Sequence, residues 1–336
     1  MTSAALPASA APEPATTQHV PVLLAETLSA LEPRDGGLYV DGTFGGGGLT
    51  RALLSAARCQ VLAIDRDPAA FARARHMAVR LGDRLIPLHG RFGDMAALCR
   101  RASPAAAERG VDGVALDLGF SSDQINTPDR GFSFQGDGPL DMRMDTSQGQ
   151  TAAELLAAIS EADLARLLHD LGEEPAARRI ARAIVETRQR MPLRRTGELA
   201  TIIRRAKGGS GKTDPATRSF QALRMAVNDE LGEIERGLVS AESLLAPGGR
   251  LAVIAFHSLE DRLVKSFLHS RSAGAAGAPS RHQPPLSADQ RRRPTLRLLH
   301  RRAIKPGEEE IRFNPRARSA RLRTAERVAV SAGESD

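Results

Sequence analysis

The feature that most restricts the fold is a run of four glycines placed directly after a short apolar segment. Residues Tyr39–Thr50 read YVDGTFGGGGLT. Glycines after a strand let the backbone approach a ligand closely, ahead of a helix N-terminus that favours negative charge. We therefore predict a buried strand over Leu38–Asp41, a ligand-binding loop, and a helix that begins near Leu49. A purely structural glycine turn is the alternative.

The segments around this loop alternate between strand and helix patterns. Further strands are predicted over Val61–Asp65, Arg84–Leu88, Gly113–Leu118 and Arg250–Phe256, with a helix over 68–81. Such alternation produces a parallel sheet with right-handed crossovers. Between residues 132 and about 230 only amphipathic helical patterns occur. The sequence thus predicts an α/β, Rossmann-like fold with an inserted all-helical domain.

The predicted domain organisation follows from these patterns. Leu296–Ile304 and Ala320–Arg327 are expected to complete a mostly parallel, seven-stranded sheet. The sheet domain would then be discontinuous, over 19–131 and 231–330, with the helical domain over 132–230. An Ala-, Pro- and Thr-rich leader over 1–18 is expected to be disordered, and the basic segment 271–293 to form a mobile loop.

Composition excludes several classes of protein. The two cysteines, Cys59 and Cys99, form no CxxC pair, so they build neither a disulfide scaffold nor a zinc cluster. This cysteine usage indicates a reducing environment, and we expect a cytoplasmic protein. Apolar runs stay far below the roughly 20 residues of a membrane span. The net charge is +7, and residues 271–336 hold 15 Lys and Arg against 7 Asp and Glu. This C-terminal excess indicates a polyanionic partner, although a solvated tail would look the same.

The glycine spacing separates two kinds of nucleotide-binding loop. A dinucleotide fingerprint needs the spacing GxGxxG. Here Gly45-x-Gly47 is followed three residues later by Thr50, so the third glycine is missing. The spacing Asp41-x-x-x-Gly45-x-Gly47 instead resembles the first motif of S-adenosylmethionine (SAM) methyltransferases.

Acidic and aromatic residues follow the next two strands. Asp65 ends the second strand, where a carboxylate can accept hydrogen bonds from both ribose hydroxyls of a nucleotide. Its alternative role is to cap the helix that starts at Pro68, but Asp67 fits that cap better. Phe92 follows the third strand and is a candidate to pack against an adenine ring, or simply in the core.

One further segment imitates a nucleotide site. Gly208–Thr213 reads GGSGKT, which is similar to a phosphate-binding loop. That motif needs a glycine five residues before Gly211, where the chain has Ala206, and no strand precedes it. We predict a flexible basic loop instead.

Eight motifs in order resemble those of the RsmH (MraW) family and span His19 to about Arg327. They are HVPVLLAE (19–26), DGTFG (41–45), VALDLGFSS (114–122), RGFSF (130–134), GPLDMRMD (138–145), ATRSFQ (216–221), FHSLEDR (256–262) and NPRARS (314–319). The resemblance implies a SAM-dependent enzyme that methylates N4 of a cytidine in the decoding centre of 16S rRNA. Its cofactor would be SAM and its partner the small ribosomal subunit. A homodimer is an option that the sequence leaves open.

The resemblance also assigns cofactor-binding positions. Beside Gly45, they are Gly47, Gly48 and Leu49 on the loop, and Asp65, Phe92, Asp117 and Gln124 beyond it. Two residues depart from the family pattern. Leu49 replaces the usual His, which removes a side-chain hydrogen bond but leaves backbone contacts. Asp123 replaces the Pro of the family's Ser-Ser-Pro-Gln.

The chemistry points to two candidate catalytic residues. The exocyclic amine of cytosine is a poor nucleophile, so the enzyme must hold it close to the methyl group and accept hydrogen bonds from its protons. Asp117 is the candidate acceptor. His257, at the end of the fifth strand, is a candidate for contacting the base or taking a proton, and equally for a structural role. Phe120 is expected either to stack on the extruded base or to lie in the core.

RNA-binding surfaces are expected over 281–327 and Arg178–Arg205. Three other functions remain alternatives. A methyltransferase acting on DNA would need a (D/N/S)PPY-type motif, which is missing, and an NAD-dependent dehydrogenase would need the third glycine. A non-catalytic RNA-binding module would tolerate Asp65→Ala.

Overall fold

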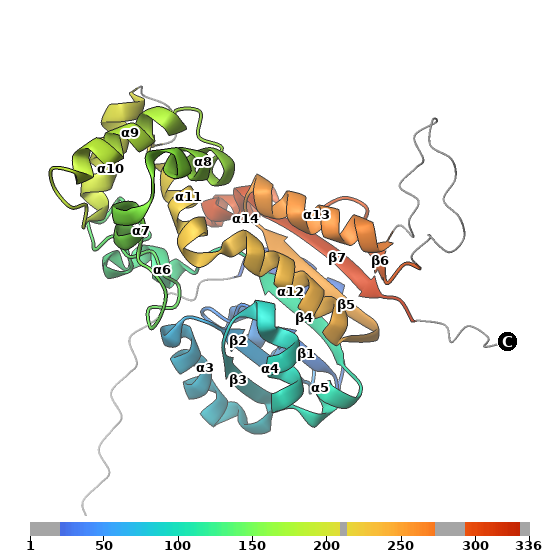
Figure 1. Cartoon of the computed structure of the whole chain (residues 1–336). Helices are drawn as coiled ribbons and strands as arrows, with labels where there is room; N and C mark the ends of the chain where they lie inside the picture. Colours follow the sequence, from blue (N-terminus) through green and yellow to red (C-terminus); the bar gives the residue numbers. More distant parts are fainter. Residues whose placement is uncertain (1–20, 209–213, 273–292, 330–336) are drawn as a thin grey trace, which may run out of the picture.

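A seven-stranded sheet forms the centre of the computed structural model, which describes residues 21–208, 214–272 and 293–329 (Figure 1). The order across the sheet is β3-β2-β1-β4-β5-β7-β6. The strands are β1 (Leu38–Asp41), β2 (Gln60–Asp65), β3 (Leu85–His89), β4 (Val111–Asp117), β5 (Leu245–Ala255), β6 (Leu296–Leu298) and β7 (Arg321–Arg327).

Strand direction divides the sheet into two parts. β1 to β5 pair in parallel, whereas β7 runs antiparallel to both β5 and β6. The predicted mostly parallel, seven-stranded sheet is therefore confirmed. The strand order reverses between β1 and β4, because β2 and β3 extend to one side and β5 to the other. In open α/β sheets, ligands bind at such a switch point, beyond the carboxyl ends of the strands.

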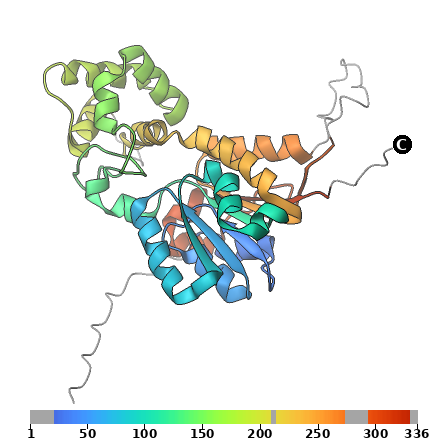
Figure 2. The same cartoon turned by 60° about the horizontal axis from the view of Figure 1, so that its bottom comes forward.

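Helices cover both faces of the sheet (Figures 1 and 2). Alternate residues of β1 point to opposite faces: Val40 packs in one apolar core and Tyr39 in the other. The first core includes side chains from α4 (Met95–Ala102), α5 (Pro104–Glu108), α12 (Glu230–Leu244) and α13 (Ser258–Ser272). The second includes side chains from α1 (Leu24–Leu31), α2 (Gly48–Ala56) and α3 (Pro68–Leu81).

Between β4 and β5 the described chain forms a helical lobe that stands beside the sheet (Figure 2). Its helices are α7 (Ala152–Ala158), α8 (Glu161–Gly172), α9 (Ala177–Arg188), α10 (Thr196–Lys207) and α11 (Thr217–Asn228). They surround a third apolar core, which includes Leu164, Ile180 and Leu223 and is separate from the two sheet cores. On this separate core we base the proposal that 132–230 is an inserted domain.

At its C-terminal end, the helical lobe joins the sheet domain through a sharp break between two helices. The sequence predicts one or two helices over Phe220–Leu245, and the structure has two, α11 and α12. Asp229 separates them with φ of 48° in the left-handed region. Apolar residues of α11 pack in the lobe, whereas those of α12 pack on the sheet. The break at Asp229 is therefore where the chain changes core.

Most predicted elements lie within a few residues of the observed ones, and one strand prediction was wrong in extent. Strand β6 ends at Leu298, not at Ile304. The chain then leaves the sheet through the exposed pair Arg301 and Arg302, and Ile304 returns to form an isolated bridge with Leu322. The sequence also predicts a helix over 259–268, which corresponds to α13. Among the described residues, five α-helices lack a sequence prediction: α1, α4, α5, α6 (Ser122–Asn126) and α14 (Glu308–Phe313).

Some predictions fall on residues that the structure does not describe. The leader 1–18 lies outside the described residues, as do 209–213 of the glycine-rich segment and most of the segment 271–293. Helix α10, not a strand, precedes Gly208, as the sequence predicts. Among the described residues, no helix combines the length and apolar character that crossing a membrane requires.

Candidate active site

A pocket lies at the switch point, where the carboxyl ends of β1 and β4 diverge. The loops that follow β1, β2, β3 and β4 all contribute to its lining, through Gly45, Asp65, Phe92 and Asp117 among others. The sequence prediction that these residues share one site is consistent with this placement. Two other predicted residues, Gly47 and His257, are not among the residues that line the pocket.

The loop after β1 is shaped by backbone conformation and by a buried carboxylate. Gly45 and Gly47 adopt φ of 51° and 73°, which favours glycine. The Asp41 carboxylate lies beneath the loop and accepts hydrogen bonds from Thr50 Oγ1 (2.7 Å) and Thr43 N (3.2 Å). Burial raises the Asp41 pKa to about 6, although the hydrogen bond from Thr50 acts in the opposite direction. Asp41 therefore supports the loop from below.

Neighbouring glycines of this loop differ in what surrounds them. Gly46 is exposed and lines the pocket, and a Cβ added there would meet no atom within 4 Å. Gly47 is buried, and a Cβ there would lie 2.6 Å from the ring of Phe44 and 2.6 Å from Met77 Cε. Gly48 and Leu49 begin α2 and line the pocket, with Leu49 also in the apolar core. The open side of the loop is thus at Gly45, Gly46 and Gly48.

Asp65 and Asp67 have separate roles at the end of β2. Asp65 accepts backbone hydrogen bonds from Gly45 (2.7 Å) and Asp67 (2.8 Å) and lines the pocket. Burial raises the pKa of Asp65, against the lowering effect of these two hydrogen bonds. Asp67 caps α3 by accepting from Ala69 N, with Pro68 as the first helical residue. The prediction that Asp67, and not Asp65, is the cap is confirmed.

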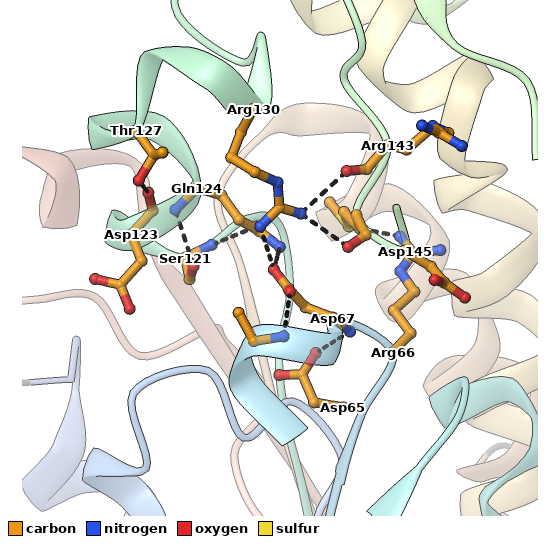
Figure 3. A network of polar contacts seen from close by, with 12 residues as sticks. Asp65, Arg66, Asp67, Ser121, Asp123, Gln124, Thr127, Arg130, Arg143 and Asp145 are labelled. Atoms are coloured by element: carbon orange, nitrogen blue, oxygen red, sulfur yellow. Dashed lines mark hydrogen bonds and ion pairs between the residues drawn. The ribbon is translucent and has the colours of Figure 1, made fainter. Parts of the chain in front are cut away.

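Asp67 also anchors a network that joins the loop after β4 to the entrance of the helical lobe (Figure 3). Its Oδ2 accepts from Gln124 Nε2 (2.8 Å) and Arg130 Nη1 (2.7 Å). Arg130 donates further to the carbonyls of Arg143 and Met144. Gln124 is buried, and its Oε1 accepts from Ser121 N in a capping box at the start of α6. The amide nitrogen and the amide oxygen of Gln124 therefore both have protein partners, although Gln124 lines the pocket.

Phe92 sits in a short 3-10 helix (Phe92–Asp94) after β3. Its ring lies against α12 at Gly237, where an added Cβ would be 2.4 Å from the ring. Part of Phe92 packs on the sheet core and part lines the pocket. Both readings of this residue, adenine contact and core packing, fit its position.

Asp117 lines the pocket and carries a buried carboxylate oxygen that has no partner among the described residues. It is the last residue of β4, and its backbone N–H donates to Thr43 Oγ1 (2.7 Å). Its Oδ1 is buried and has no hydrogen-bond partner among the described residues. Burial, with smaller contributions from the charges of Asp41 and Glu260, raises the Asp117 pKa to about 8. A buried carboxylate oxygen without a partner is costly, which indicates that a ligand supplies the missing hydrogen bond.

Phe120 stands at the mouth of the pocket. It lies three residues after Asp117, is 36% exposed and lines the pocket, so the core alternative is wrong for this residue. The Phe132 ring is nearby, with centroids 6.3 Å apart and planes tilted by 36°. An exposed ring that lines the pocket is suited to stacking on a base.

His257 faces away from the pocket and into a cluster of carboxylates. Its Nε2 lies 3.1 Å from Glu260 Oε1. Burial acts to raise the Glu260 pKa, but the neighbouring His257, the backbone N–H of Phe256 and Arg224 together hold that pKa below its ordinary value. Ligand atoms of Glu230, His257 and Glu260 lie within 4.8 Å of one another, a spacing that could hold a metal. However, Arg224 donates to both oxygens of Glu230 (2.7 and 2.8 Å), so the cluster is already paired with a cation.

Residues near both ends of the described chain also border the pocket, although the sequence placed Asn314 and Arg316 only within an expected RNA-binding surface, 281–327. Val22 lines it from the N-terminal side, and Asn314 and Arg316 from the C-terminal side. Arg316 donates to Ser122 Oγ (2.9 Å) and Asn126 Oδ1 (3.3 Å), which ties the C-terminal segment to α6. The motifs HVPVLLAE and NPRARS marked these segments as family features, but nothing in their residue types revealed where they meet.

The fold and the site together define a class of enzyme. The sheet order with an antiparallel β7, the glycine loop after β1 and the acidic residue after β2 are those of a Rossmann-like, SAM-dependent methyltransferase. The residues fit this cofactor, since the open glycine side of the loop leaves room for it and Asp117 offers an unpartnered oxygen.

Comparison with known proteins identifies the family. The profile of the MraW methylase family matches residues 16–328. A ribosomal RNA small subunit methyltransferase H from Paramagnetospirillum magneticum is 54% identical over 317 residues, which cover 94% of this chain and 98% of that protein. One from Rhodospirillum centenum is 55% identical over 322 residues, or 95% and 94% of the two chains. The chain belongs to the MraW methylase family.

Proposed function

We propose that this protein transfers the methyl group of SAM to the exocyclic N4 amine of a cytidine in the decoding centre of 16S rRNA. The names of its relatives support small-subunit ribosomal RNA as the substrate. The observation that carries the chemistry is that Asp117, which lines the pocket, has a buried Oδ1 without a hydrogen-bond partner. A substrate of this kind also implies a cytoplasmic location.

The cofactor would lie across the loops at the switch point. Gly45, Gly46 and Gly48 leave backbone exposed for the methionine part, and Asp65 would accept hydrogen bonds from the ribose hydroxyls. Each Asp65 oxygen already accepts one backbone N–H, and each retains capacity for a second hydrogen bond. Phe92 would contact the adenine ring. Gly47 and Gln124 would act through the shape of the loops that they hold.

Asp117 would act on the acceptor amine. When bound, SAM supplies a methyl group that its sulfonium already activates, so the enzyme has to position and prepare the nucleophile. An ionised Asp117 accepts a hydrogen bond from an amine proton and so helps the nitrogen lone pair to leave conjugation with the ring. A positive ligand charge in the pocket favours the ionised form and lowers its raised pKa.

His257 would serve this reaction indirectly. Its ring does not border the pocket, and its nearest charged partner is Glu260. Glu260 in turn accepts hydrogen bonds from the backbone N–H groups of Phe256 (2.8 Å) and His257 (3.3 Å), at the junction of β5 and α13. We therefore infer that His257 stabilises this junction, and Phe256 is the residue of the junction that lines the pocket.

The helical lobe would hold the RNA backbone. Arg178, Arg190, Arg194 and Arg205 are exposed on it. Positive side chains of this kind bind phosphates and position an RNA without selecting the base. Selection would come from the shape of the assembled subunit and from the pocket around Phe120 and Asp117.

The test uses small ribosomal subunits from cells that lack this enzyme. The subunits, naked rRNA and duplex DNA are each incubated with the protein and methyl-labelled SAM, and the labelled nucleoside is identified by mass spectrometry. N4-methylcytidine on the subunit supports the proposal. Label in DNA or in another nucleoside contradicts the proposed substrate, and no transfer to any of the three contradicts the proposed activity under these conditions. Asp117→Ala is the matched variant, with SAM-product binding measured by calorimetry.

A further inference from the structure

We propose that Arg224 of the helical lobe is a positioning residue of the methyl-transfer site: it fixes the ring of Phe120 at the pocket mouth, in the orientation that stacks on the target base. This inference rests on the proposed function for its catalytic consequence. Its structural part, the fixing of the ring, can be measured without any substrate.

The contact between the two side chains is direct. Arg224 lies on α11, is 7% exposed, and places its guanidinium carbon 4.5 Å from the centroid of the Phe120 ring. Phe120 belongs to the loop after β4 and is 36% exposed. A guanidinium over an aromatic face is attracted by the ring quadrupole, and more strongly where water is excluded. The lobe thus covers part of a ring whose remaining surface faces the pocket.

Arg224 is itself held in one orientation. Its Nε donates to Glu230 Oε1 at 2.7 Å and its Nη2 to Glu230 Oε2 at 2.8 Å, and both side chains are buried. Two parallel hydrogen bonds fix the plane of a guanidinium, which a single contact would not do. The left-handed Asp229 turns the chain so that Glu230, the first residue of α12, meets Arg224 on α11. The break between α11 and α12 therefore brings Glu230 to the position where it orients Arg224.

The end of α11 is tied to the cofactor corner of the sheet. Asn228 donates through Nδ2 to the carbonyls of Met142 (2.7 Å) and Arg224 (2.8 Å). Arg66, which directly follows Asp65, donates through Nη1 to the Asn228 carbonyl (3.0 Å). Arg224 thus comes from the lobe, yet its backbone is fixed relative to the residues that would bind the ribose.

These contacts give the lobe a second role beside holding RNA. When a base stacks on an aromatic ring that rotates freely, the ring loses rotational entropy, and this cost weakens the binding of the base. A ring that Arg224 already orients needs no such ordering. The expected consequence is a loss in kcat when the pair is removed, since the acceptor nitrogen is held less often in line with the methyl group.

The test removes the pair without leaving an isolated buried charge. Arg224→Met alone would strand Glu230, so the variant is Arg224→Met with Glu230→Gln. The matched control is Arg271→Met with Glu242→Gln, which removes the ion pairs of Glu242 with Arg271 (2.9 Å) and Arg327 (3.3 Å) at the opposite end of α12. Arg224→Lys keeps the positive charge but not the two parallel hydrogen bonds to Glu230. Its kcat should therefore lie between those of the double variant and the wild type.

The first readout is kinetic, on the small subunit. We expect kcat to fall at least tenfold in the Arg224/Glu230 variant, with KM for the subunit within threefold and affinity for the SAM product within twofold of wild type. The control pair should keep kcat within twofold. A kcat within twofold of wild type in the Arg224/Glu230 variant, or an equal loss in the control, overturns the proposal.

The second readout reports the ring itself. The chain contains no tryptophan, so Phe120→Trp introduces a single fluorophore at the ring position. Time-resolved anisotropy should show faster local rotation of the introduced indole when the Arg224/Glu230 pair is removed, and no change in the control. Unchanged rotation overturns the inference even if activity falls. If wild-type protein fails to methylate the subunit, the proposed function fails, whereas the anisotropy still decides whether Arg224 fixes the ring.

Discussion

Replacing either of two adjacent glycines by alanine should have opposite effects on stability and on cofactor binding. Gly47 adopts φ of 73°, and its added Cβ would lie 2.6 Å from Phe44 and from Met77. The left-handed conformation costs an L-residue about 1–2 kcal/mol, and crowding in a packed core costs about 1–3 kcal/mol. The lower entropy of the unfolded alanine chain returns about 0.4–1 kcal/mol. Gly47→Ala should therefore lower the free energy of unfolding by about 1–5 kcal/mol.

Gly46→Ala should leave the fold intact and damage the pocket. Gly46 lies outside the left-handed region, and its Cβ would meet no protein atom within 4 Å. Alanine also lowers the entropy of the unfolded chain relative to glycine. The free energy of unfolding should therefore stay equal or rise by up to about 1 kcal/mol. The methyl group would project into the cofactor space. Overpacking by about 1–3 kcal/mol weakens binding roughly 5- to 150-fold.

Two measurements separate these effects. Chemical denaturation gives the free energy of unfolding, and calorimetric titration with S-adenosylhomocysteine gives the affinity. Gly307→Ala is the control, since Gly307 is also open at Cβ and does not line the pocket. A Gly46→Ala protein that binds the nucleoside as tightly as wild type would refute the reasoning that this loop holds the cofactor. A Gly47→Ala protein of unchanged stability would refute the steric argument.

Three further predictions concern single side chains. The Asp117 pKa is raised to about 8 in the folded protein and is near 3.8 in the unfolded chain. The folded state therefore binds the proton more tightly than the unfolded state. As a result, the contribution of Asp117 to stability is lost as pH rises from about 4 through 8. Asp117→Asn should therefore unfold at a higher temperature than wild type at pH 8.5 while losing methyl transfer; a lower melting temperature contradicts this. Arg130→Met should cost about 2–3 kcal/mol in urea unfolding, somewhat less than a fully buried pair because Arg130 is 17% exposed, and an unchanged midpoint would show that its pair with Asp67 contributes nothing. Arg316→Ala should change the free energy of unfolding by less than about 0.5 kcal/mol. It should also speed the dissociation of S-adenosylhomocysteine in stopped-flow measurements, because the hydrogen bonds from Arg316 to Ser122 and Asn126 are lost. An unchanged dissociation rate would show that these hydrogen bonds do not help to retain the ligand.

The parts of the fold that the sequence predicts are those governed by local patterns. Apolar runs specified the central strands, and helix α3 spans the predicted 68–81 because Pro68 and the Asp67 cap define its start. Strand β6 was overestimated because the run from Leu296 to Ile304 is apolar and basic, and nothing local shows that Arg301 and Arg302 leave the sheet. Helix α6 was missed since its five residues depend on a capping box between Ser121 and Gln124.

The residues of the site also fall into those that local sequence patterns predict and those that they do not. Asp65 and Phe92 were found because they lie at or just after the ends of predicted strands and therefore reach the same edge of the sheet, whereas Asp117 was assigned through the family resemblance. Gly46 and Gly47 are indistinguishable in a run of four glycines, and only the backbone angles separate the open position from the packed one. Arg224 and Arg316 were beyond sequence reasoning, because each acts on a loop more than 100 residues away along the chain.

The place of β7 in the sheet has a consequence for how this protein is made. β7 lies between β5 and β6, so one edge of the apolar strand β5 stays open until residue 327 has been synthesised. At the speed of a ribosome, the interval between the end of β5 and the end of β7 lasts roughly 4–14 s. During that time the nascent chain exposes an edge that can pair with other chains. Asn314 and Arg316 arrive in the same interval, so the nascent protein completes its pocket only as it completes its sheet. We therefore expect the nascent chain to stay inactive, with the β5 edge unpaired, until the residues between the end of β5 and the end of β7 have been made.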